Sequence, residues 1–283
     1  MNKPLLIIGN KRSGTSFLVS LLNLHPKIFI AHEADVIWLL YQLYRQTGFK
    51  GYRWDNQAGM NDTLASCGRL LAKDKTPKEN FDRVLTCLMT QGSSWTQPMP
   101  NKKVEWLGDK KPFQNMDPEL VPFILENFPE VRFIHLIRHP FAMAFSASKF
   151  KKADGIEMWG KMSFEELIER WTMHEKWALE LKDNSRARVI TLKYEDLCRR
   201  TSAELKRLFE FLSLPVDRQM LKKAERMTNY LAKGYPEMKV SVETAEIMKS
   251  YGYKTEALNR PKLVEKLLFY LWKTRKLIFS LFV

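Results

Sequence analysis

The chain has 283 residues, enough for one large or two small domains, because a typical domain has roughly 100 to 200 residues. Its 46 Lys and Arg residues exceed its 32 Asp and Glu residues, which gives a formal net charge of +14. A basic chain attracts anions, but charge alone does not choose between a nucleotide, a nucleic acid and an anionic membrane. The sequence contains Cys67, Cys87 and Cys198 without a Cys-x-x-Cys motif, which argues against a disulfide framework and a zinc site. We therefore expect a reducing, cytoplasmic location.

The stretch from Leu5 to Leu18 predicts a strand, an anion-binding loop and a helix. Gly9 and Gly14 bound a Gly-x-x-x-x-Gly loop, whose backbone N–H groups can surround a phosphate-like oxyanion. A nucleoside triphosphatase has Lys directly after the second glycine, whereas this chain has Thr15 there. Its cations lie inside the loop, as Lys11 and Arg12, so we expect an anion other than a metal-chelated triphosphate. Too few residues precede Leu5 for a signal peptide or an N-terminal anchor.

The next elements are expected to bring a proton acceptor to the same edge of the sheet. Thr15 to Leu24 predicts a helix, and Ile28 to Ala31 predicts a second strand, with Glu33 just beyond it. Ligands of open parallel sheets bind beyond the carboxyl ends of the strands, which is where a general base would act. His32 is the alternative base, and capping of a helix is the alternative role of Glu33. Neighbouring residues at a strand end point to opposite sides, so only one of the two should face an acceptor.

A helix over Ala34 to Gln46 is expected to lead into an insertion over the site. Thr47 to Asn80 has no helical or strand periodicity and is rich in glycine. Several aromatic side chains could stack on a sugar or serve in the core: Phe49, Tyr52, Trp54 and Trp95. Phe81 to Gln91 then predicts a helix and Val104 to Leu107 a third strand.

A further apolar run, Val131 to Ile137, ends on Arg138 rather than on an acid. In a P-loop triphosphatase the matching strand usually ends in the Asp that holds magnesium. An arginine there removes the metal ligand and adds a second anion site, and Arg138 with Ser146 would suit a phosphate monoester without a metal. Pro118 places a helix over Asp117 to Asn127 before this strand.

The second half of the chain predicts more alternation of helices and strands. A Ser-x-x-Glu capping box, Ser163 with Glu166, opens a helix that runs to Asp183. Ala187 to Leu192 predicts a strand, and the helices expected after it are Thr201 to Leu212 and Asp217 to Thr228. The fold class is therefore α/β, a single domain with a P-loop-like central parallel sheet flanked by helices and with helical insertions.

At this point the chain resembles the sulfotransferases that use 3′-phosphoadenosine 5′-phosphosulfate (PAPS), in the branch of bacterial and tyrosylprotein sulfotransferases. The resemblance rests on Lys-Arg-Ser-Gly-Thr-Ser, as the 5′-phosphosulfate loop, and on Ile-Arg-His-Pro-Phe-Ala-Met-Ala-Phe-Ser, as the 3′-phosphate motif. It implies an in-line transfer of a sulfuryl group to an acceptor hydroxyl or amine, without a metal. The resemblance implies that the donor contacts Lys11, Arg12, Ser13, Gly14, Thr15, Ser16, Arg138, Ser146 and Tyr194.

The resemblance also implies that Glu33 is the base and that Arg12 and Lys110 stabilise the charge that develops during transfer, although Lys111 could replace Lys110. Relatives that act on acidic tyrosine peptides have arginines where this chain has Asp35 and Leu39, which argues against such an acceptor. A glycan, a lipid-linked acceptor or a small metabolite stays open. A P-loop kinase or nucleotide-binding protein is the alternative function, and no nucleic-acid-binding motif is present.

The end of the chain is both apolar and basic from Arg260 onward. Charged residues interrupt its apolar runs well before the roughly 20 residues that a membrane span requires. We expect a sulfotransferase domain over residues 1–259 and a basic amphipathic helix over residues 260–283. That helix could lie on the anionic inner surface of a membrane or pack on the domain. Leu231 to Val242 is expected to be an irregular segment that closes over the nucleotide, by resemblance to the family.

Overall fold

The computed structural model describes residues 2–53, 55, 57–148, 162–227 and 239–255. The chain divides into two compact units. The first unit comprises Met1–Arg138 and Arg170–Asn229, and the second comprises His139–Glu169 and Tyr230–Val283. All five strands of the sheet belong to the first unit.

The sheet of the first unit is entirely parallel, in the order β2-β3-β1-β4-β5. The strands are β1 (Lys3–Gly9), β2 (Ile28–His32), β3 (Trp106–Lys110), β4 (Arg132–Ile137) and β5 (Arg188–Lys193). The central strand β1 pairs with β3 on one side and with β4 on the other, so that Ile7 lies opposite both Lys110 and Ile134. The carboxyl ends of these strands therefore meet at one edge of the sheet, as the sequence predicted.

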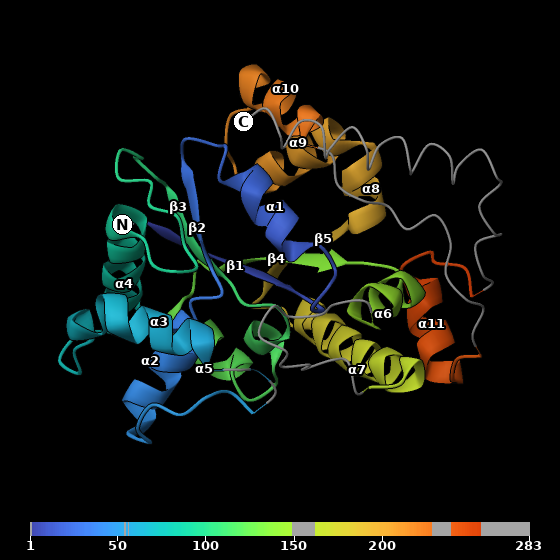
Figure 1. Ribbon diagram of the computed structural model, residues 1–283, viewed down its shortest axis with the longest axis horizontal. Helices are drawn as coiled ribbons and strands as arrows, with labels where there is room; N and C mark the ends of the chain where they lie inside the picture. Colours follow the sequence, from blue (N-terminus) through green and yellow to red (C-terminus); the bar gives the residue numbers. More distant parts are fainter. Residues whose placement is uncertain (1, 54, 56, 149–161, 228–238, 256–283) are drawn as a thin grey trace, which may run out of the picture. The chain divides into compact units, whose positions relative to one another are not determined.

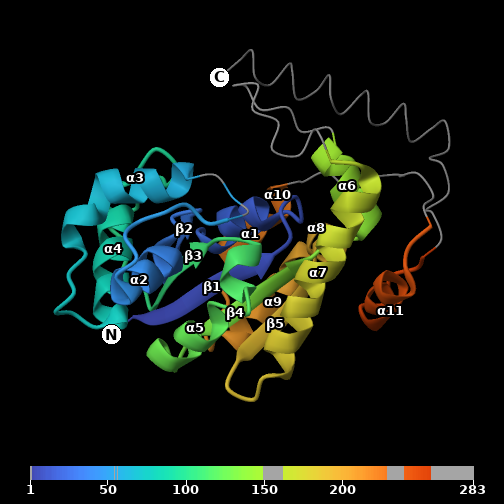
Figure 2. The ribbon, with the colours of Figure 1, turned by 90° about the horizontal axis from the view of Figure 1, so that it is seen from below.

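The strands are apolar at almost every position because helices cover both faces of the sheet. Side chains alternate between the faces: Leu6 and Ile8 of β1 belong to a core cluster that also contains Phe29 and Leu107, whereas Leu5 and Ile7 do not. Figures 1 and 2 show α2, α4 and α5 on the side of that cluster and α1, α8 and α9 on the opposite side. These helices have the bounds α1 Thr15–Leu22, α2 Val36–Arg45, α4 Pro77–Gln91, α5 Val121–Asn127, α8 Tyr194–Arg199 and α9 Thr201–Phe211.

The remaining helical segments are α3 (Ala58–Cys67), η1 (Gly68–Leu70), η2 (Phe113–Met116), α6 (Pro140–Ser148), α7 (Phe164–Asp183), α10 (Arg218–Arg226) and α11 (Val242–Ser250). The predicted capping box of α7 is present, because the Glu166 backbone N–H donates to Ser163 Oγ and the Ser163 N–H donates to Glu166 Oε2. Helix α4 begins earlier than predicted, at Pro77, because Thr76 and Glu79 form a second capping box.

Three expectations for the first half of the chain were wrong in detail. The segment expected to lack regular structure contains α3, whose residues pack on the backbone after β2. Helix α5 starts at Val121 with Pro122 in its first turn, not at Asp117, because Asp117 instead caps the turn before it. Strand β3 extends to Lys110, so this lysine belongs to the strand itself.

The expectation that no disulfide forms was also wrong. Cys67, at the end of α3, is bonded to Cys87 on α4, with their Cα atoms 6.3 Å apart. Wide spacing in sequence concealed the pair because α3 and α4 pack side by side. Cys198 is the free cysteine.

The second unit contains α6, the first residues of α7, and α11. His139 connects its two segments, because its Nε2 lies 3.1 Å from the Lys254 carbonyl and its ring lies against Tyr253, with centroids 5.1 Å apart. Two segments that the sequence singled out lie outside the described residues: most of the segment from Leu231 to Val242, and the tail from Arg260.

Candidate functional site

The loop after β1 has backbone geometry that depends on glycine at both ends. Gly9 has φ 142°, and a Cβ there would lie 2.4 Å from the Leu136 carbonyl oxygen, so only glycine fits beside β4. Gly14 has φ 93°, and a Cβ there would lie 2.3 Å from the ring of Tyr194. Arg12, between them, also adopts a left-handed conformation, with φ 68°. The loop thus turns tightly into α1, and Tyr194 packs against its last glycine.

Two cations lie together at this loop. The Arg138 side chain is buried, donates from Nη1 to the Arg12 carbonyl at 2.9 Å and lies over the Tyr194 ring at 4.4 Å from its centroid. Burial lowers the pKa of Arg12, and the charge of Arg138 lowers it further. Ser13 Oγ and Arg138 Nε are buried without a hydrogen-bond partner among the described residues. Adjacent cations and unpartnered donors of this kind are suited to the oxygens of a phosphate or sulfate group.

The residues after β2 and at the end of β3 meet at the start of α1. Lys110 Nζ donates to Glu33 Oε1 at 2.6 Å and lies 3.5 Å from Ser16 Oγ. His32 Nε2 lies 2.9 Å from the same Ser16 oxygen. His32 and Glu33 therefore both face this group, contrary to the expected alternation, because Glu33 has a left-handed backbone with φ 54°. The lysine in this group is Lys110, and Lys111 lies elsewhere.

The charges of this group are set by Lys110. Burial opposes ionisation of Glu33, but Lys110 and Lys111 favour it, and together they lower the pKa of Glu33 to about 2. Burial, followed by the charge of Lys110, lowers the pKa of His32 to about 4. At neutral pH the site therefore contains a carboxylate and a neutral imidazole, either of which is in the form that accepts a proton.

A second set of charges forms a chain beside this group. Lys111 Nζ lies 2.6 Å from Asp35 Oδ2 and 3.1 Å from Asp55 Oδ2, and Lys11 Nζ pairs with the other oxygen of Asp55. Burial opposes the charge of Lys111, but Asp35 and Asp55 raise its pKa above the ordinary value. Lys11, expected to contact the donor, is thus paired with a residue of the inserted segment and lies over the ring of Phe113.

A buried polar network, which the sequence did not predict, holds the loop between β1 and α1 in position. Glu175 is fully buried, and its Oε1 accepts a 2.7 Å hydrogen bond from Asn10 Nδ2. Its Oε2 lies 3.1 Å from His135 Nε2. His174 Nδ1 lies 2.7 Å from Asn10 Oδ1, and burial lowers the pKa of His174 to about 3. Nothing in the spacing of these residues predicted the network, because Asn10 and Glu175 are 165 positions apart.

Asp109 is another polar residue with a structural role near the site. Its carboxylate is fully buried at the end of β3 and accepts hydrogen bonds from the backbone N–H groups of Ala34 and Val36, both at 3.1 Å. Burial, followed by the charge of Asp35, raises its pKa to about 6. Asp109 thus fixes the backbone that carries Glu33.

The remaining candidates have different surroundings. Ser146 lies on α6 of the second unit. Tyr52 is buried and donates its hydroxyl to Asp117, so it is a core residue. Phe49 and Trp95 are about two-fifths exposed, at 41% and 40%, and Trp54 lies outside the described residues.

Comparison with known proteins identifies the family of the chain. The model of the family described as "Sulfotransferase family" matches residues 4–218, which is more than half of the chain. The chain belongs to the sulfotransferase family. Its reaction is accordingly the transfer of a sulfuryl group, and the kinase alternative is not favoured. A sequence comparison with curated proteins found no match.

Solved structures of sulfotransferases share the fold. The sulfotransferase domain of the curacin biosynthetic pathway has a TM-score of 0.58 and 16% identity, covering 90% of this chain and 99% of that one. The sulfotransferase domain of the Synechococcus PCC 7002 olefin synthase has a TM-score of 0.56 and 17% identity, covering 89% and 96%. The sulfotransferase STF9 from Mycobacterium avium has a TM-score of 0.51 and 14% identity, covering 90% and 78%.

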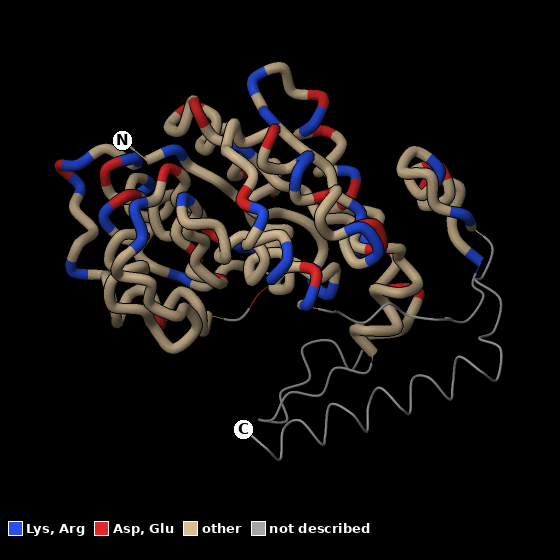
Figure 3. Tube along the Cα trace, turned by 90° about the horizontal axis from the view of Figure 1, so that it is seen from above, with Lys and Arg blue, Asp and Glu red and all other residues tan. Residues whose placement is uncertain are grey.

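The charges of the described residues are dispersed. Figure 3 shows Lys and Arg positions on many elements, with Asp and Glu positions between them. In the described part of the chain, no helix has the length and apolar character that crossing a membrane requires. Within the same residues, no group of three or more His, Cys, Asp or Glu side chains is placed to hold a metal ion.

Proposed function

We propose that this sulfotransferase takes its sulfuryl group from PAPS and binds that donor at the loop between β1 and α1. The observation that carries the proposal is the proximity of part-buried Arg12 to buried Arg138, beside Ser13 Oγ and Arg138 Nε, which have no hydrogen-bond partner among the described residues. Two cations held close together and partly away from water repel each other, and a bound anion would offset this repulsion. The backbone N–H groups at the start of α1, from Ser13 to Ser16, would add donors to the 5′-phosphosulfate.

Arg138 would bind the 3′-phosphate, and the sequence motif that contains it predicts the same role for Ser146. Tyr194 supports this role because its ring lies between Gly14 and the Arg138 guanidinium. Trp171 Nε1 donates to the Arg138 backbone carbonyl at 3.0 Å, and Arg138 Nη1 donates to the Arg12 carbonyl at 2.9 Å. A guanidinium held by the Arg12 carbonyl and the Tyr194 ring is preorganised for a phosphate, which lowers the entropy lost on binding.

Glu33 would be the general base. Lys110 Nζ contacts both the Glu33 carboxylate and Ser16 Oγ in the first turn of α1. A proton acceptor and a cation therefore lie beside the proposed donor loop. As the acceptor oxygen or nitrogen forms its bond to sulfur, Glu33 Oε would take the proton of that atom and the S–O bond to the leaving phosphate would break. Lys110 and Arg12 would stabilise the negative charge that develops on the sulfuryl and phosphate oxygens. Lys11 would bind the donor only after releasing Asp55.

Calorimetry tests the donor. We expect 3′-phosphoadenosine 5′-phosphate to bind equally with and without magnesium, and ATP to bind more weakly under both conditions. Tight, magnesium-dependent ATP binding without bisphosphate binding would contradict the proposal.

The acceptor is an alcohol or amine of a glycan, a lipid-linked compound or a small metabolite. An acidic peptide is disfavoured because Asp35, which occupies the position of a peptide-binding arginine, is buried and paired with Lys111. Incubation of a cell extract with radiolabelled donor, with a Glu33→Gln control, would identify the labelled product class.

We further propose, from the basic and apolar composition of residues 260–283, that this segment is a helix on the anionic cytoplasmic face of a membrane; packing on the domain is the alternative. Sedimentation with anionic vesicles tests this proposal: the full chain should bind them and be released by salt, and a chain ending at residue 259 should not. Equal recovery of the two chains would favour a helix packed on the domain.

A further inference from the structure

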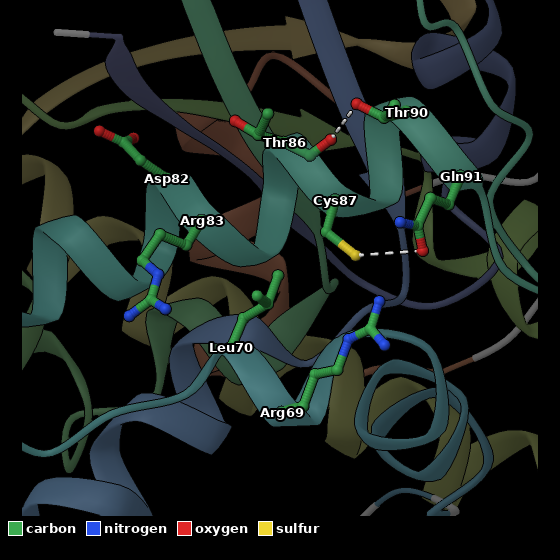
Figure 4. Close-up of a pocket in the computed structure, with 8 residues that line it drawn as sticks. All are labelled: Arg69, Leu70, Asp82, Arg83, Thr86, Cys87, Thr90 and Gln91. Carbon is green, nitrogen blue, oxygen red and sulfur yellow. Dashed lines mark hydrogen bonds between the residues drawn. The ribbon is translucent and has the colours of Figure 1, made fainter.

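The Cys67–Cys87 disulfide borders a cavity that lies on the insertion, away from the donor loop. The cavity has a volume of about 440 Å³. Its lining includes Cys87 and two arginines, Arg69 and Arg83. Figure 4 shows the guanidinium of Arg69 and the amide of Gln91 extending toward the Cys87 sulfur, and Arg83 on the other side of Leu70.

The two sulfur atoms differ in access. Cys67 is fully buried, whereas Cys87 lines the cavity and retains 8% of its exposure. A thiolate that enters the cavity would therefore reach Cys87. Arg69 and Arg83 both line the cavity, and the acid in its lining, Asp82, is paired with Lys78, so two cations of the wall stay available to an anion.

The surroundings accommodate the reduced form as well. Cys87 Sγ lies 3.8 Å from Gln91 Oε1 and 3.9 Å from the Ser66 carbonyl oxygen. Either oxygen would accept a hydrogen bond from a Cys87 thiol once the disulfide has opened. The site thus has polar partners for both oxidation states.

We propose that the Cys67–Cys87 bond is a thiol-exchange site and that the cavity admits a small thiol bearing carboxylates. The incoming thiolate attacks Cys87 Sγ, the S–S bond breaks, and its electron pair passes to Cys67 Sγ, which takes a proton from water. A second molecule of the thiol then attacks the mixed disulfide, releases the small-molecule disulfide and leaves Cys87 as a thiol. The same small-molecule disulfide oxidises the pair in reverse. Arg69 and Arg83 select for the carboxylates.

Thiol exchange at the Cys67–Cys87 bond affects the proposed base, Glu33, through helix α3. Helix α3 ends at Cys67, and its other end packs on the backbone after β2. Thr63 Oγ1 donates to the Ala34 carbonyl at 2.8 Å, and a Cβ on Gly59 would lie 2.0 Å from the Glu33 carbonyl oxygen. Opening the bond releases one end of α3 from α4 and loosens its contact with Glu33. This second step rests on the proposed role of Glu33, but the exchange itself does not.

Thiol kinetics tests the site without any sulfotransferase assay. The oxidised protein is incubated with glutathione or with uncharged 2-mercaptoethanol at matched thiolate concentrations, and free thiols are alkylated and mapped by mass spectrometry. We expect glutathione to open the bond about tenfold faster, because cations at a cleft concentrate anions. Arg69→Gln should remove this preference, and Lys73→Gln, which removes an exposed charge outside the cavity lining, should preserve it.

Three results would overturn the proposal: equal rates for the two thiols, a mixed disulfide at Cys198 rather than Cys87, or two free thiols at Cys67 and Cys87 after treatment with oxidised glutathione.

Hydrogen exchange tests whether opening the bond loosens α3 and its contact with Glu33. Amides of residues 58–67 should exchange faster in the reduced protein and in Cys87→Ser than in the oxidised protein. Unchanged amide exchange would show that the disulfide affects only its own surroundings and would overturn the link to Glu33. This result does not depend on whether the chain transfers sulfuryl groups.

Discussion

Asn10 of the loop after β1 donates a 2.7 Å hydrogen bond to Glu175, a carboxylate with no exposure to solvent. The two residues are 165 positions apart in sequence, so the bond fixes the loop to a helix from the second half of the chain. The other carboxylate oxygen faces His135 on the neighbouring strand β4. The buried Glu175 carboxylate therefore holds the loop between β1 and α1 in position through Asn10.

Glu175→Leu tests this arrangement. It leaves Asn10 and His135 without their shared acceptor, and we expect the free energy of unfolding to fall by about 3 to 5 kcal/mol, as for removal of one partner of a buried pair. Urea unfolding followed by circular dichroism measures the loss. Glu180→Leu, on the same helix, is the matched control and should change stability by less than about 1 kcal/mol. Similar losses in both variants would contradict the role of the network.

The base is tested by Glu33→Gln, which keeps the shape of the side chain but cannot accept a proton. Turnover at saturating donor should fall by roughly 100- to 10,000-fold, and the Kd for 3′-phosphoadenosine 5′-phosphate should change little. His32→Gln is the matched control, because both side chains face Ser16. Near-normal turnover in Glu33→Gln, with turnover lost in His32→Gln, would make His32 the base.

The donor site is tested by Arg138→Ala. Loss of a charge-assisted contact should weaken bisphosphate binding by about 1.5 to 3 kcal/mol, measured by calorimetry. Arg12→Ala should weaken binding and also slow turnover, because its charge would act on the donor in both the ground state and the transition state. Arg186→Ala, a part-buried arginine that donates to the Leu125 carbonyl, is the control for loss of a cation. Unaltered binding in Arg138→Ala would remove it from the donor site.

Asp55 pairs with the Lys11 ammonium, so it would compete with a donor that binds Lys11 as proposed. Asp55→Asn should release Lys11 and tighten bisphosphate binding by up to about tenfold, or ~1.4 kcal/mol. Lys111 keeps Asp35 as its partner in this variant. Asp74→Asn, which alters an exposed pair with Lys75, should leave the affinity unchanged. Weaker binding in Asp55→Asn would show that Asp55 positions Lys11 rather than competing for it.

The pH dependence follows from the lowered pKa of Glu33. Its ordinary value is 4.5 and the folded value is about 2, so the pair with Lys110 contributes its full stability above pH 4.5 and loses it as the pH falls toward 2. We expect kcat/KM to show no loss of activity from protonation of Glu33 or His32 between about pH 5.5 and about pH 8. An acid limb with a midpoint between about 6 and 7 that vanishes in His32→Gln would contradict this assignment.

Local patterns in the sequence predicted the loop after β1 and the strand that ends before Arg138. Gly9 ends β1 and Arg138 follows β4, so short-range spacing was enough to place both residues at the carboxyl edge of the sheet, whereas their contact with the donor stays a prediction. The network at Glu175 was not predictable in this way, because an isolated acid on an amphipathic helix is normally a solvated residue. Its function comes from burial against Asn10, which only the folded chain reveals.

Helix α3 and the backbone at Glu33 were harder to predict, for two physical reasons. Helix α3 lacks an amphipathic pattern and is held by tertiary contacts at Gly59 and Thr63, so its sequence resembles a loop. The alternation rule for strand ends failed at Glu33, because a positive φ turns its side chain to the same side as His32. Neither contact leaves a signature in spacing or composition.

The order of the strands indicates which segment of the enzyme can change in sequence and length without altering the central strands. The loop proposed to bind the donor follows the central strand β1, whereas Glu33 follows β2, the strand at the edge of the sheet. The long insertion lies between α2 and β3 in sequence, so changes within α3 and its neighbouring loops alter no residue of β1 or β4. If PAPS binds at the loop after β1 as proposed, exchange of this segment can change the acceptor without altering the strands that carry the donor site.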